Sequence, residues 1–319
     1  MRNVVIAGYV RSPFTFAMTV VMNLGIALGA ELILLPRFEL EQLLKTAHRK
    51  RPTLFPGVPT LFTAINAAPA LSDYDLSSIK YCISGGAPLP AEVKSRFESL
   101  TGCTLVEGYG LSEASPVVSC NPLHESPRIG SIGVPLAATE VQIRSLDNPL
   151  RALPTGEKGE LCVRGPQVMA GYWQRPEETA RTFVEGWLRT GDVGLIDEDG
   201  YIFLVDRIKD VILAGGYNIY PRLIEEAIYQ HPDVEEVVVI GIPDQYRGQS
   251  PKAFVRSRAG VEMTAEILKA FLADKLSRIE MPREIEFREQ LPKTMVGKLS
   301  KKELVAEEMA KLRVQRAAS

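Results

Sequence analysis

Short apolar runs that stop at glycine and lead into predicted helices recur between residues 37 and 130, and they constrain the fold most strongly. Residues 79–84 form one such run, which ends at Gly85-Gly86 and precedes a predicted helix over residues 90–99 that proline opens. Residues 104–107 form a second run that again stops at glycine. Because strand, glycine turn and helix alternate here, we expect a sheet with helices on its faces.

The rest of the chain divides into a β-rich stretch and a compact stretch of mixed helix and strand. Short β-rich runs follow one another over residues 130–208, and a good hairpin turn lies at Asp197-Glu198-Asp199-Gly200. From residue 209 onward, amphipathic helices predicted over residues 221–230 and 264–278 alternate with apolar strand-like runs.

The predicted fold class is therefore α/β plus α+β. The 319 residues are enough for about two domains of roughly 150 residues each. We expect a partial large domain over residues 1–208, made of an α/β portion over 1–129 and a small β-barrel-like subdomain over 130–208. A small α+β C-terminal domain is expected over residues 209–319.

The stretch from residue 14 to 35 is nearly all apolar, with Glu31 as its one charge, and is long enough to be considered as a membrane span. Gly25 and Gly29 form a small-residue pair of the kind found in such spans. The alternative is a buried helix followed by a buried strand over residues 31–35. We favour the alternative, because Gly29-Ala30-Glu31 interrupts the run as a loop between helix and strand does.

Charge and cysteine usage exclude several other classes of protein. The formal net charge is -2, so the composition does not indicate a nucleic-acid partner. The four cysteines are scattered without a Cys-x-x-Cys pair, which argues against a zinc site or a disulfide framework. We expect reduced, buried thiols in a cytoplasmic protein with at most peripheral membrane association.

Two glycine-flanked polar clusters follow the predicted strands of the α/β portion. The first is Ser84-Gly85-Gly86-Ala87-Pro88-Leu89, a turn that lets a flat ligand approach the backbone closely, or simply a tight turn. The second is Glu107-Gly108-Tyr109-Gly110-Leu111-Ser112-Glu113. The Ser112 hydroxyl can donate to a phosphate, and the Glu113 carboxylate can hold Mg²⁺. The same segment approaches a hydrolase nucleophile elbow, so a serine hydrolase with Ser112 as nucleophile stays open.

Two further clusters lie later in the chain. In Trp187-Leu188-Arg189-Thr190-Gly191-Asp192, the aspartate can accept hydrogen bonds from the hydroxyls of a ribose or can cap a turn. The last cluster runs from Asp206 through Gly215-Gly216 and is paired with a late polar loop that ends at Gly297-Lys298. A lysine on such a loop can reach a phosphate with its ammonium group or can point into solvent.

Together and in this order, the four clusters resemble those of the adenylate-forming enzymes, among them the acyl-CoA synthetases. The resemblance covers nearly the whole chain from about Ala17 onward. Two phrases, Gly108-Tyr109-Gly110-Leu111-Ser112-Glu113 and Asp206-Arg207-Ile208-Lys209-Asp210-Val211-Ile212-Leu213, resemble the bacterial long-chain fatty-acid and dicarboxylic-acid CoA ligases most closely. The resemblance implies ATP-dependent adenylation of a carboxylic acid, here a fatty acid, followed by thioester formation with coenzyme A.

The resemblance also implies a role for individual residues. Ser112 would contact the α-phosphate, Glu113 would bind Mg²⁺, and Lys298 would bridge the acid's carboxylate and the α-phosphate. Lys209 falls on the hinge between the large domain and a mobile small domain. The residues implied to contact the adenine, the ribose or the pantetheine of coenzyme A are Gly85, Gly86, Ala87, Tyr109, Gly110, Asp192, Arg207, Gly215 and Gly216.

The sequence departs from the family pattern in its first part. The Ser/Thr/Gly-rich loop that holds the β- and γ-phosphates in the family has no counterpart, and the residues before about Phe14 do not resemble the family. We therefore expect a truncated chain that begins partway through the large domain and whose activity is impaired. A non-catalytic remnant that binds nucleotide or coenzyme A, or one half of a split enzyme, is the alternative.

Overall fold

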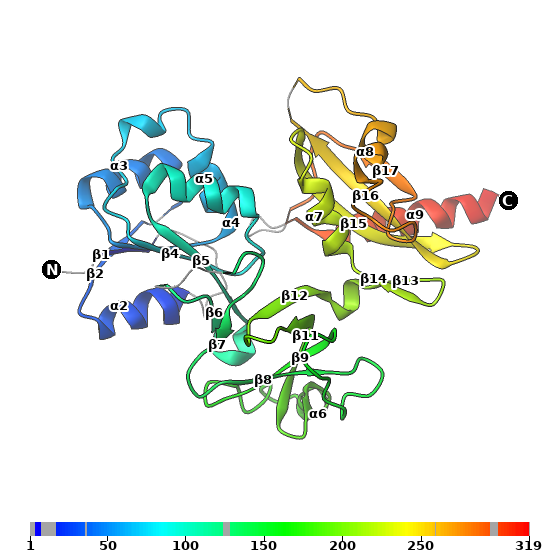
Figure 1. Cartoon of the computed structure of the whole chain (residues 1–319), viewed down its shortest axis with the longest axis horizontal. Helices are drawn as coiled ribbons and strands as arrows, with labels where there is room; N and C mark the ends of the chain where they lie inside the picture. Colours follow the sequence, from blue (N-terminus) through cyan, green and yellow to red (C-terminus); the bar gives the residue numbers. More distant parts are fainter. Residues whose placement is uncertain are drawn as a thin grey trace. The chain divides into compact units, whose positions relative to one another are not determined.

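The computed structural model describes residues 4–7, 17–35, 37–123, 128–258, 260–293 and 299–318. The chain divides into two compact units (Figure 1). The first contains the described residues up to Thr190 together with Gly194–Leu204, and the second contains Gly191–Val193 and the described residues from Val205 onward. The domain boundary that the sequence suggests, between residues 208 and 209, stays a prediction.

A seven-stranded sheet forms the centre of the first unit, in the order β2-β1-β3-β4-β5-β6-β7. Strands β1 to β5 are parallel, whereas β6 and β7 join antiparallel. The strands are β1 (Val4–Ala7), β2 (Glu31–Leu34), β3 (Leu54–Gly57), β4 (Tyr81–Ser84), β5 (Thr104–Gly110), β6 (Val117–Cys120) and β7 (Val134–Pro135). The parallel part is the predicted α/β sheet.

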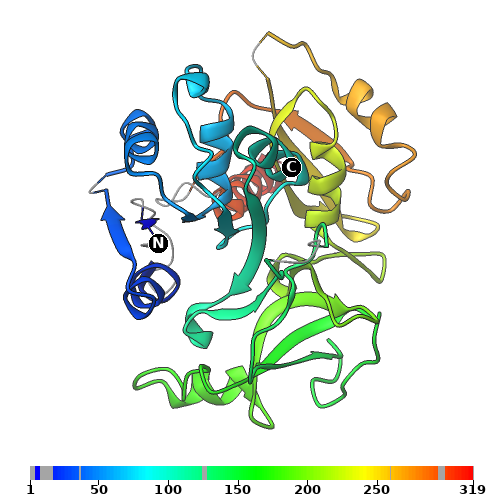
Figure 2. The same cartoon turned by 60° about the vertical axis from the view of Figure 1, so that its left-hand side comes forward.

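Three helices cover one face of this sheet, whereas α2 lies on the other (Figures 1 and 2). The three helices on the first face are α3 (Leu40–Lys50), α4 (Pro59–Asn66) and α5 (Ala91–Thr101). A single 3₁₀ turn, η2 (Leu71–Asp73), follows α4. Phe62 of α4 and Phe97 of α5 are fully buried, with ring centroids 4.9 Å apart and edge to face. Gly102 ends α5 in the left-handed conformation that glycine adopts without steric cost. The apolar faces of the helices therefore supply the core that the sequence pattern predicts.

The apolar stretch near the start of the chain is largely exposed where the structure describes it, with Val21 and Gly25 as the buried residues, so the prediction of a buried helix and strand is wrong for most of it. A π-helix, η1 (Ala17–Asn23), leads into α2 (Leu24–Ala27) and then β2, yet Ile26 is 64% and Leu34 is 71% exposed. The physical reason is that β2 lies at the edge of the sheet and pairs with β1 alone.

The glycine at the centre of the same stretch has a local packing role. A Cβ at Gly25 would come within 2.4 Å of the Leu32 side chain, so glycine here permits close contact between α2 and β2. Within the described part of the chain, no helix combines the length and the apolar character that crossing a bilayer requires.

The β-rich stretch forms a five-stranded sheet in the order β10-β11-β9-β8, with β12 paired to β11. The predicted hairpin turn joins β11 to β12, where Asp197 Oδ1 accepts hydrogen bonds from the backbone N–H groups of Asp199 and Tyr201. The elements are β8 (Glu140–Arg144), β9 (Gly159–Arg164), α6 (Pro176–Thr182), β10 (Phe183–Val184), β11 (Trp187–Ile196) and β12 (Ile202–Arg207).

A sheet with helices on both faces forms the second unit, in the order β14-β13-β16-β15, with β17 parallel to β16. Val237 and Val239 of β15 pack with α7 and α8, whereas Val238 and Ile240 pack with Leu304 of α9. Because both faces of β15 are covered, its central residues 237–243 form a continuous apolar run. The elements are η4 (Ile208–Asp210), β13 (Ile212–Ala214), β14 (Tyr217–Ile219), α7 (Pro221–Tyr229), β15 (Val234–Asp244), β16 (Gly248–Ser257), α8 (Ala265–Leu272), β17 (Glu284–Phe287) and α9 (Lys301–Ala318).

Helix α8 begins as the sequence predicts but ends earlier than residue 278. The Thr264 side chain caps its first turn by accepting from the Ile267 N–H. After Leu272, its carbonyl accepts from the N–H groups of both Lys275 and Leu276, and the chain continues as turns. With this difference, the predicted fold class of α/β plus α+β is confirmed.

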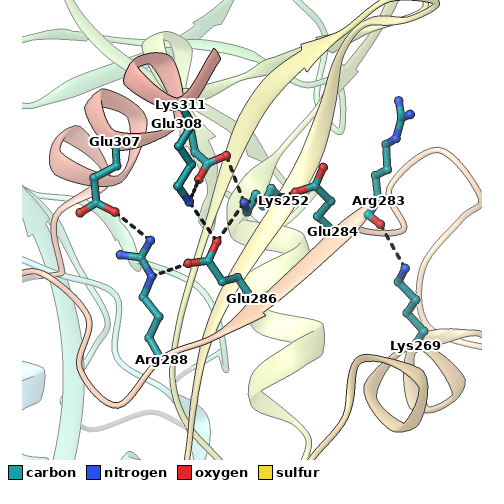
Figure 3. A network of polar contacts seen from close by, with 9 residues as sticks. All are labelled: Lys252, Lys269, Arg283, Glu284, Glu286, Arg288, Glu307, Glu308 and Lys311. Atoms are coloured by element: carbon teal, nitrogen blue, oxygen red, sulfur yellow. Dashed lines mark hydrogen bonds and ion pairs between the residues drawn. The ribbon is translucent and has the colours of Figure 1, made fainter. Parts of the chain in front are cut away.

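A cluster of charged residues joins α9 to the sheet of the second unit (Figure 3). At its centre is Lys252 of β16, whose side chain is 6% exposed and whose Nζ lies 3.2 Å from Glu284, 2.9 Å from Glu286 and 3.0 Å from Glu308. Burial opposes the charge of this lysine, but hydrogen bonds to the three carboxylates outweigh it and raise the pKa of Lys252 to about 12. Further ion pairs around it join Arg288 to Glu286 and Glu307, and Lys311 to Glu286 and Glu308.

Candidate functional site

The first two predicted clusters start side by side at one edge of the main sheet. Strands β4 and β5 are parallel neighbours, with Ser84 in register with Glu107. Strand β4 ends at Ser84, whereas β5 continues to Gly110. The loops that follow the two strands lie toward the same edge of the sheet, as loops at the carboxyl ends of parallel strands do. The Leu89 N–H donates to Glu107 Oε1 at 3.3 Å and links the two loops directly.

Strand β4 ends at Ser84, whose side chain has no hydrogen-bond partner in the described part of the chain, and leads into a glycine turn. The Gly85 N–H donates to the Gly57 carbonyl at 3.1 Å, and Gly86 has a φ of 80°. Ala87 completes the predicted trio of ligand-lining residues. The Ser84 hydroxyl is fully buried and has no hydrogen-bond partner among the described residues. A buried hydroxyl without a partner costs free energy, so this edge has a polar group available for a ligand.

In the second cluster, β5 bends sharply through a β-bulge between Tyr109 and Gly110. A Cβ at Gly110 would lie 1.9 Å from the Pro116 carbonyl oxygen, so this position accepts glycine alone. The Tyr109 ring is partly buried against Val118 and the neighbouring small core. The bend leads directly into a 3₁₀ turn, η3 (Ser112–Ala114), which carries the predicted phosphate and Mg²⁺ contacts.

Glu113 has a partner that the sequence patterns did not reveal. Its Oε1 accepts a hydrogen bond from the Tyr172 hydroxyl at 2.8 Å, and its backbone carbonyl accepts from the Met169 N–H at 2.8 Å. Burial, followed by the hydrogen bond to Glu113, raises the pKa of Tyr172. Residues 113 and 172 are 59 positions apart in the sequence, so no local sequence pattern predicts this contact.

Glu113 can serve as a magnesium ligand without a larger cluster of protein ligands. Within the described ranges, no group of three or more His, Cys, Asp or Glu side chains is placed to hold a metal. Mg²⁺ in nucleotide sites is commonly held by one or two carboxylates together with phosphate oxygens and water. The single carboxylate of Glu113 fits that arrangement.

Asp192 of the third cluster and the start of the fourth cluster lie together in the second unit. Asp192 of β11 has a side chain that is 13% exposed, and its Oδ1 lies 3.3 Å from Nε of Arg207 at the end of β12. The guanidinium of Arg207 is 62% exposed. Arg207 therefore holds the Asp192 carboxylate at this position.

Asp206, the first residue of the fourth cluster, has a structural role that the sequence patterns did not reveal. Its side chain is buried, and its two oxygens accept from the N–H groups of Arg207 and Arg222, each at 2.7 Å. Arg222 lies in the first turn of α7, so Asp206 caps that helix. Lys209, the predicted hinge residue, follows in η4. Asp206 therefore ties the chain next to the predicted hinge to the first helix of the second unit.

Gly215 and Gly216 form the two-residue turn between β13 and β14. Their φ values are 58° and 86°, the pair of positive values that this kind of hairpin turn demands. The Gly215 N–H donates to the Arg247 carbonyl at 2.8 Å. The glycines are therefore required by the backbone of the turn.

Lys298 lies outside the described residues, but residues on both sides of it come together. Lys293 pairs with Leu299 in an isolated bridge, and the Ser300 N–H donates to the Pro292 carbonyl at 2.8 Å. These contacts join the two ends of the segment that contains Lys298.

Two carboxylates of the second unit form ion pairs with lysines that flank this segment. The Lys293 ammonium lies 2.5 Å from Glu236, and the Lys301 ammonium lies 3.1 Å from Glu225. Burial raises the pKa of Glu225, which also accepts a hydrogen bond from the Val239 N–H.

Two protein-family models match the chain. The model of the AMP-binding enzymes matches residues 3–173, and the model of the AMP-binding enzyme C-terminal domain matches residues 223–298. The expectation that the residues before about Phe14 do not resemble the family is therefore wrong.

Known proteins agree with this match in sequence and in fold. The long-chain-fatty-acid–CoA ligase of Bacillus subtilis (strain 168) is 50% identical over 92% of this chain and 52% of its own length. A feruloyl-CoA synthase of Amycolatopsis sp is 42% identical over 86% of this chain and 56% of its own. The crystal structure of ATP-bound MatB from Rhodopseudomonas palustris is similar in fold, with a TM-score of 0.89 and 30% identity. The match covers 96% of this chain and 60% of the MatB chain. The chain thus spans about half the length of the curated relatives it matches. These agreements in sequence and fold show that the chain belongs to the family of AMP-binding enzymes.

Proposed function

We propose that this chain carries the adenylate- and coenzyme A-binding part of an acyl-CoA ligase, which activates a carboxylic acid with ATP and transfers it to coenzyme A. One observation carries the proposal. Strands β4 and β5 are parallel neighbours, and glycines lie at or directly after the carboxyl end of each. The buried Ser84 hydroxyl lies at the end of β4, and the Glu113 carboxylate lies in η3, which follows β5. The 50% identity to a long-chain-fatty-acid–CoA ligase supports the same reaction.

The chemistry explains why such residues suffice without a side-chain nucleophile. A carboxylate is a poor electrophile because its charge repels nucleophiles, and attachment of AMP removes that charge and supplies a leaving group. Mg²⁺, when bound, neutralises charge on the phosphates. Ser112 donates to the α-phosphate, Glu113 holds the metal, and Lys298 stabilises the charge that develops on the phosphorus and its oxygens.

The remaining proposed contacts orient the nucleotide and the thiol. Asp192 accepts hydrogen bonds from the ribose hydroxyls, with Arg207 holding the carboxylate from its other side. The backbone of Gly85, Gly86 and Ala87, with Tyr109 and Gly110, borders the adenine. Gly215 and Gly216 border the pantetheine arm of coenzyme A, and Lys209 is the hinge about which the second unit turns.

The acid that we propose is a fatty acid, because the relative of highest identity reported above acts on long-chain fatty acids by its name. A direct test incubates the chain with ATP, Mg²⁺, coenzyme A and either palmitate or ferulate, and measures the thioester by mass spectrometry. We expect palmitoyl-CoA in excess of feruloyl-CoA. The reverse preference would contradict the fatty-acid assignment. A folded chain that binds nucleotide but forms neither thioester would identify the non-catalytic remnant instead.

A serine hydrolase that uses Ser112 is the other candidate from the sequence. Two of the three histidines lie in the described residues, and each accepts a backbone hydrogen bond: His48 from the Asp75 N–H, and His231 from the Asp233 N–H. We expect a fluorophosphonate probe to leave Ser112 unlabelled. Labelling that disappears in Ser112→Ala would favour the hydrolase over the ligase.

The contact between Tyr172 and Glu113 leads to a prediction about metal binding. Tyr172→Phe removes the donor that fixes the Glu113 carboxylate, and loss of such a partner typically weakens metal binding. Because Tyr172 is 38% exposed, we expect a modest effect, an increase of about three- to tenfold in the Mg²⁺ concentration for half-maximal ATP binding. Fluorescent ATP titrated at varied Mg²⁺ measures it. Tyr246→Phe, at a 94% exposed tyrosine, is the control, and equal Mg²⁺ dependence in both variants would contradict the role of Tyr172.

A further inference from the structure

Two cysteine thiols meet in the core of the first unit, outside the proposed reaction. Cys82 lies in β4, and Cys103 immediately precedes the first residue of β5. Their sulfur atoms are 3.6 Å apart, and the side chains are buried, with exposures of 0% for Cys82 and 6% for Cys103. Because Cys82 pairs in register with Leu105, the two cysteines lie diagonally across neighbouring parallel strands and on the same face.

The surroundings give the two thiols different chemical character. The hydrogen bond with Cys82 lowers the pKa of Cys103 against the opposing effect of burial, and the Thr101 hydroxyl helps. Burial raises the pKa of Cys82 well above its usual range. Cys103, at the end of a loop and slightly exposed, is therefore the thiol that ionises and meets a small solute first.

The other cysteines lack this combination. Burial raises the pKa of Cys120 to about 11 and that of Cys162 to about 12. A thiol that stays protonated is a poor nucleophile toward oxidants. These two residues therefore serve as internal controls within the same unit.

We propose that Cys82 and Cys103 form a redox-active dithiol that hydrogen peroxide converts to an intramolecular disulfide. The Cys103 thiolate attacks one peroxide oxygen, the O–O bond breaks, and hydroxide leaves, so that Cys103 becomes a sulfenic acid. The Cys82 sulfur then attacks the Cys103 sulfur, the S–O bond breaks, and water leaves as the S–S bond forms. In sum, two thiols and one hydrogen peroxide give one disulfide and two waters.

The geometry permits this bond with a small local movement. A disulfide has its sulfurs about 2.05 Å apart, so the two atoms must approach by roughly 1.5 Å from their present separation. Diagonal neighbours on adjacent strands lie about 7–8 Å apart, slightly beyond the usual disulfide range, so the backbone of the loop before β5 must shift in addition to side-chain rotation. The bond would join the two strands whose carboxyl ends carry the proposed nucleotide site, at Ser84 and Glu107. The inference does not depend on the proposed function, because neither thiol takes part in that reaction.

The test uses the full reduced chain, treated with hydrogen peroxide and then alkylated under denaturing conditions. We expect the wild type to lose two alkylation sites, mass spectrometry to identify a peptide pair joined through Cys82 and Cys103, and dithiothreitol to restore both sites. Cys162→Ala is expected to behave in the same way. Four alkylated cysteines before and after peroxide, or a disulfide that includes Cys120 or Cys162, would overturn the proposal.

Single substitutions separate the roles of the two thiols. In Cys82→Ala, the sulfenic acid has no partner, so we expect dimedone to label Cys103. In Cys103→Ala, we expect no dimedone label at Cys82. Labelling of Cys82 in place of Cys103 would overturn the assigned order of attack. The wild-type experiment stands without these variants if either fails to fold.

Discussion

Lys298→Ala is expected to slow adenylation about 10²–10³-fold while leaving adenylate binding almost unchanged. The reason is that the lysine acts on charge that develops as the acid attacks the phosphorus, so its contact is stronger in the transition state than in the bound nucleotide. The exchange of pyrophosphate into ATP with saturating acid measures the rate. Calorimetric titration with a non-hydrolysable acyl-AMP mimic measures the binding.

A matched control for Lys298 lies close by in the sequence. Lys302, in the first turn of α9, is an exposed lysine, and Lys302→Ala should change neither quantity beyond about twofold, as is usual for surface substitutions. A fall in nucleotide affinity as large as the fall in rate would mean that Lys298 binds the ground state instead. A rate as high as that of Lys302→Ala would remove Lys298 from the reaction.

Lys252→Met is expected to destabilise the second unit by about 3 kcal/mol, the lower end of the range for breaking a buried ion pair. Methionine preserves the length of the side chain but leaves Glu284, Glu286 and Glu308 without the central cation that joins β16, β17 and α9 (Figure 3). The midpoint of thermal unfolding should fall by roughly 10 °C for a unit of this size.

The network itself provides controls for that experiment. Lys269, whose ammonium donates to the Arg283 carbonyl, is partly exposed and lies outside the Lys252 ion pairs, and Lys269→Met should change stability by about 1 kcal/mol or less. The double variant with Lys252→Met and Glu308→Gln should recover part of the loss, because one uncompensated carboxylate is removed. Equal stability of Lys252→Met and the wild type would mean that packing alone holds α9.

The stability difference should also depend on pH. Lys252 and Arg288 hydrogen-bond to Glu286 and, against the effect of burial, lower its pKa from 4.5 to about 2. A lowered carboxyl pKa contributes stability above its ordinary value that is lost as the pH falls through the folded-state value. The advantage of the wild type over Lys252→Met should therefore be full above pH 4.5 and shrink as the pH falls toward 2. A gap that stays constant over this window would exclude an electrostatic cause.

Much of the fold follows from local sequence signals. Apolar strands that end at glycine, the turn at residues 197–200 and the N-terminal cap at Thr264 each depend on neighbours in the chain. Burial of the stretch around α2 could not be predicted in the same way, because exposure there depends on what lies beyond β2 at the sheet edge. The early end of α8 also depends on backbone contacts that periodicity does not encode.

The candidate site shows the same division. The glycines of both loops could be identified from the sequence. Backbone geometry requires glycine at Gly110, where a Cβ would meet the Pro116 carbonyl, and favours it at Gly86, where φ is 80°. Tyr172 and the Lys252 network could not, because their partners come from distant segments. In the sequence, Lys252 follows a proline and resembles any exposed strand lysine until β17 and α9 are brought against it.

The most direct test of the account is calorimetric titration of the folded chain with a non-hydrolysable acyl-AMP mimic, in the wild type, Asp192→Ala and the control Asp199→Ala. We predict micromolar binding by the wild type and by Asp199→Ala. Asp192→Ala should lose about 1.5–3 kcal/mol, the contribution of hydrogen bonds to a charged group, which corresponds to roughly 10- to 150-fold in affinity. No binding by a folded wild-type chain, or equal affinity in Asp192→Ala, would contradict the claim that these residues form an adenylate site.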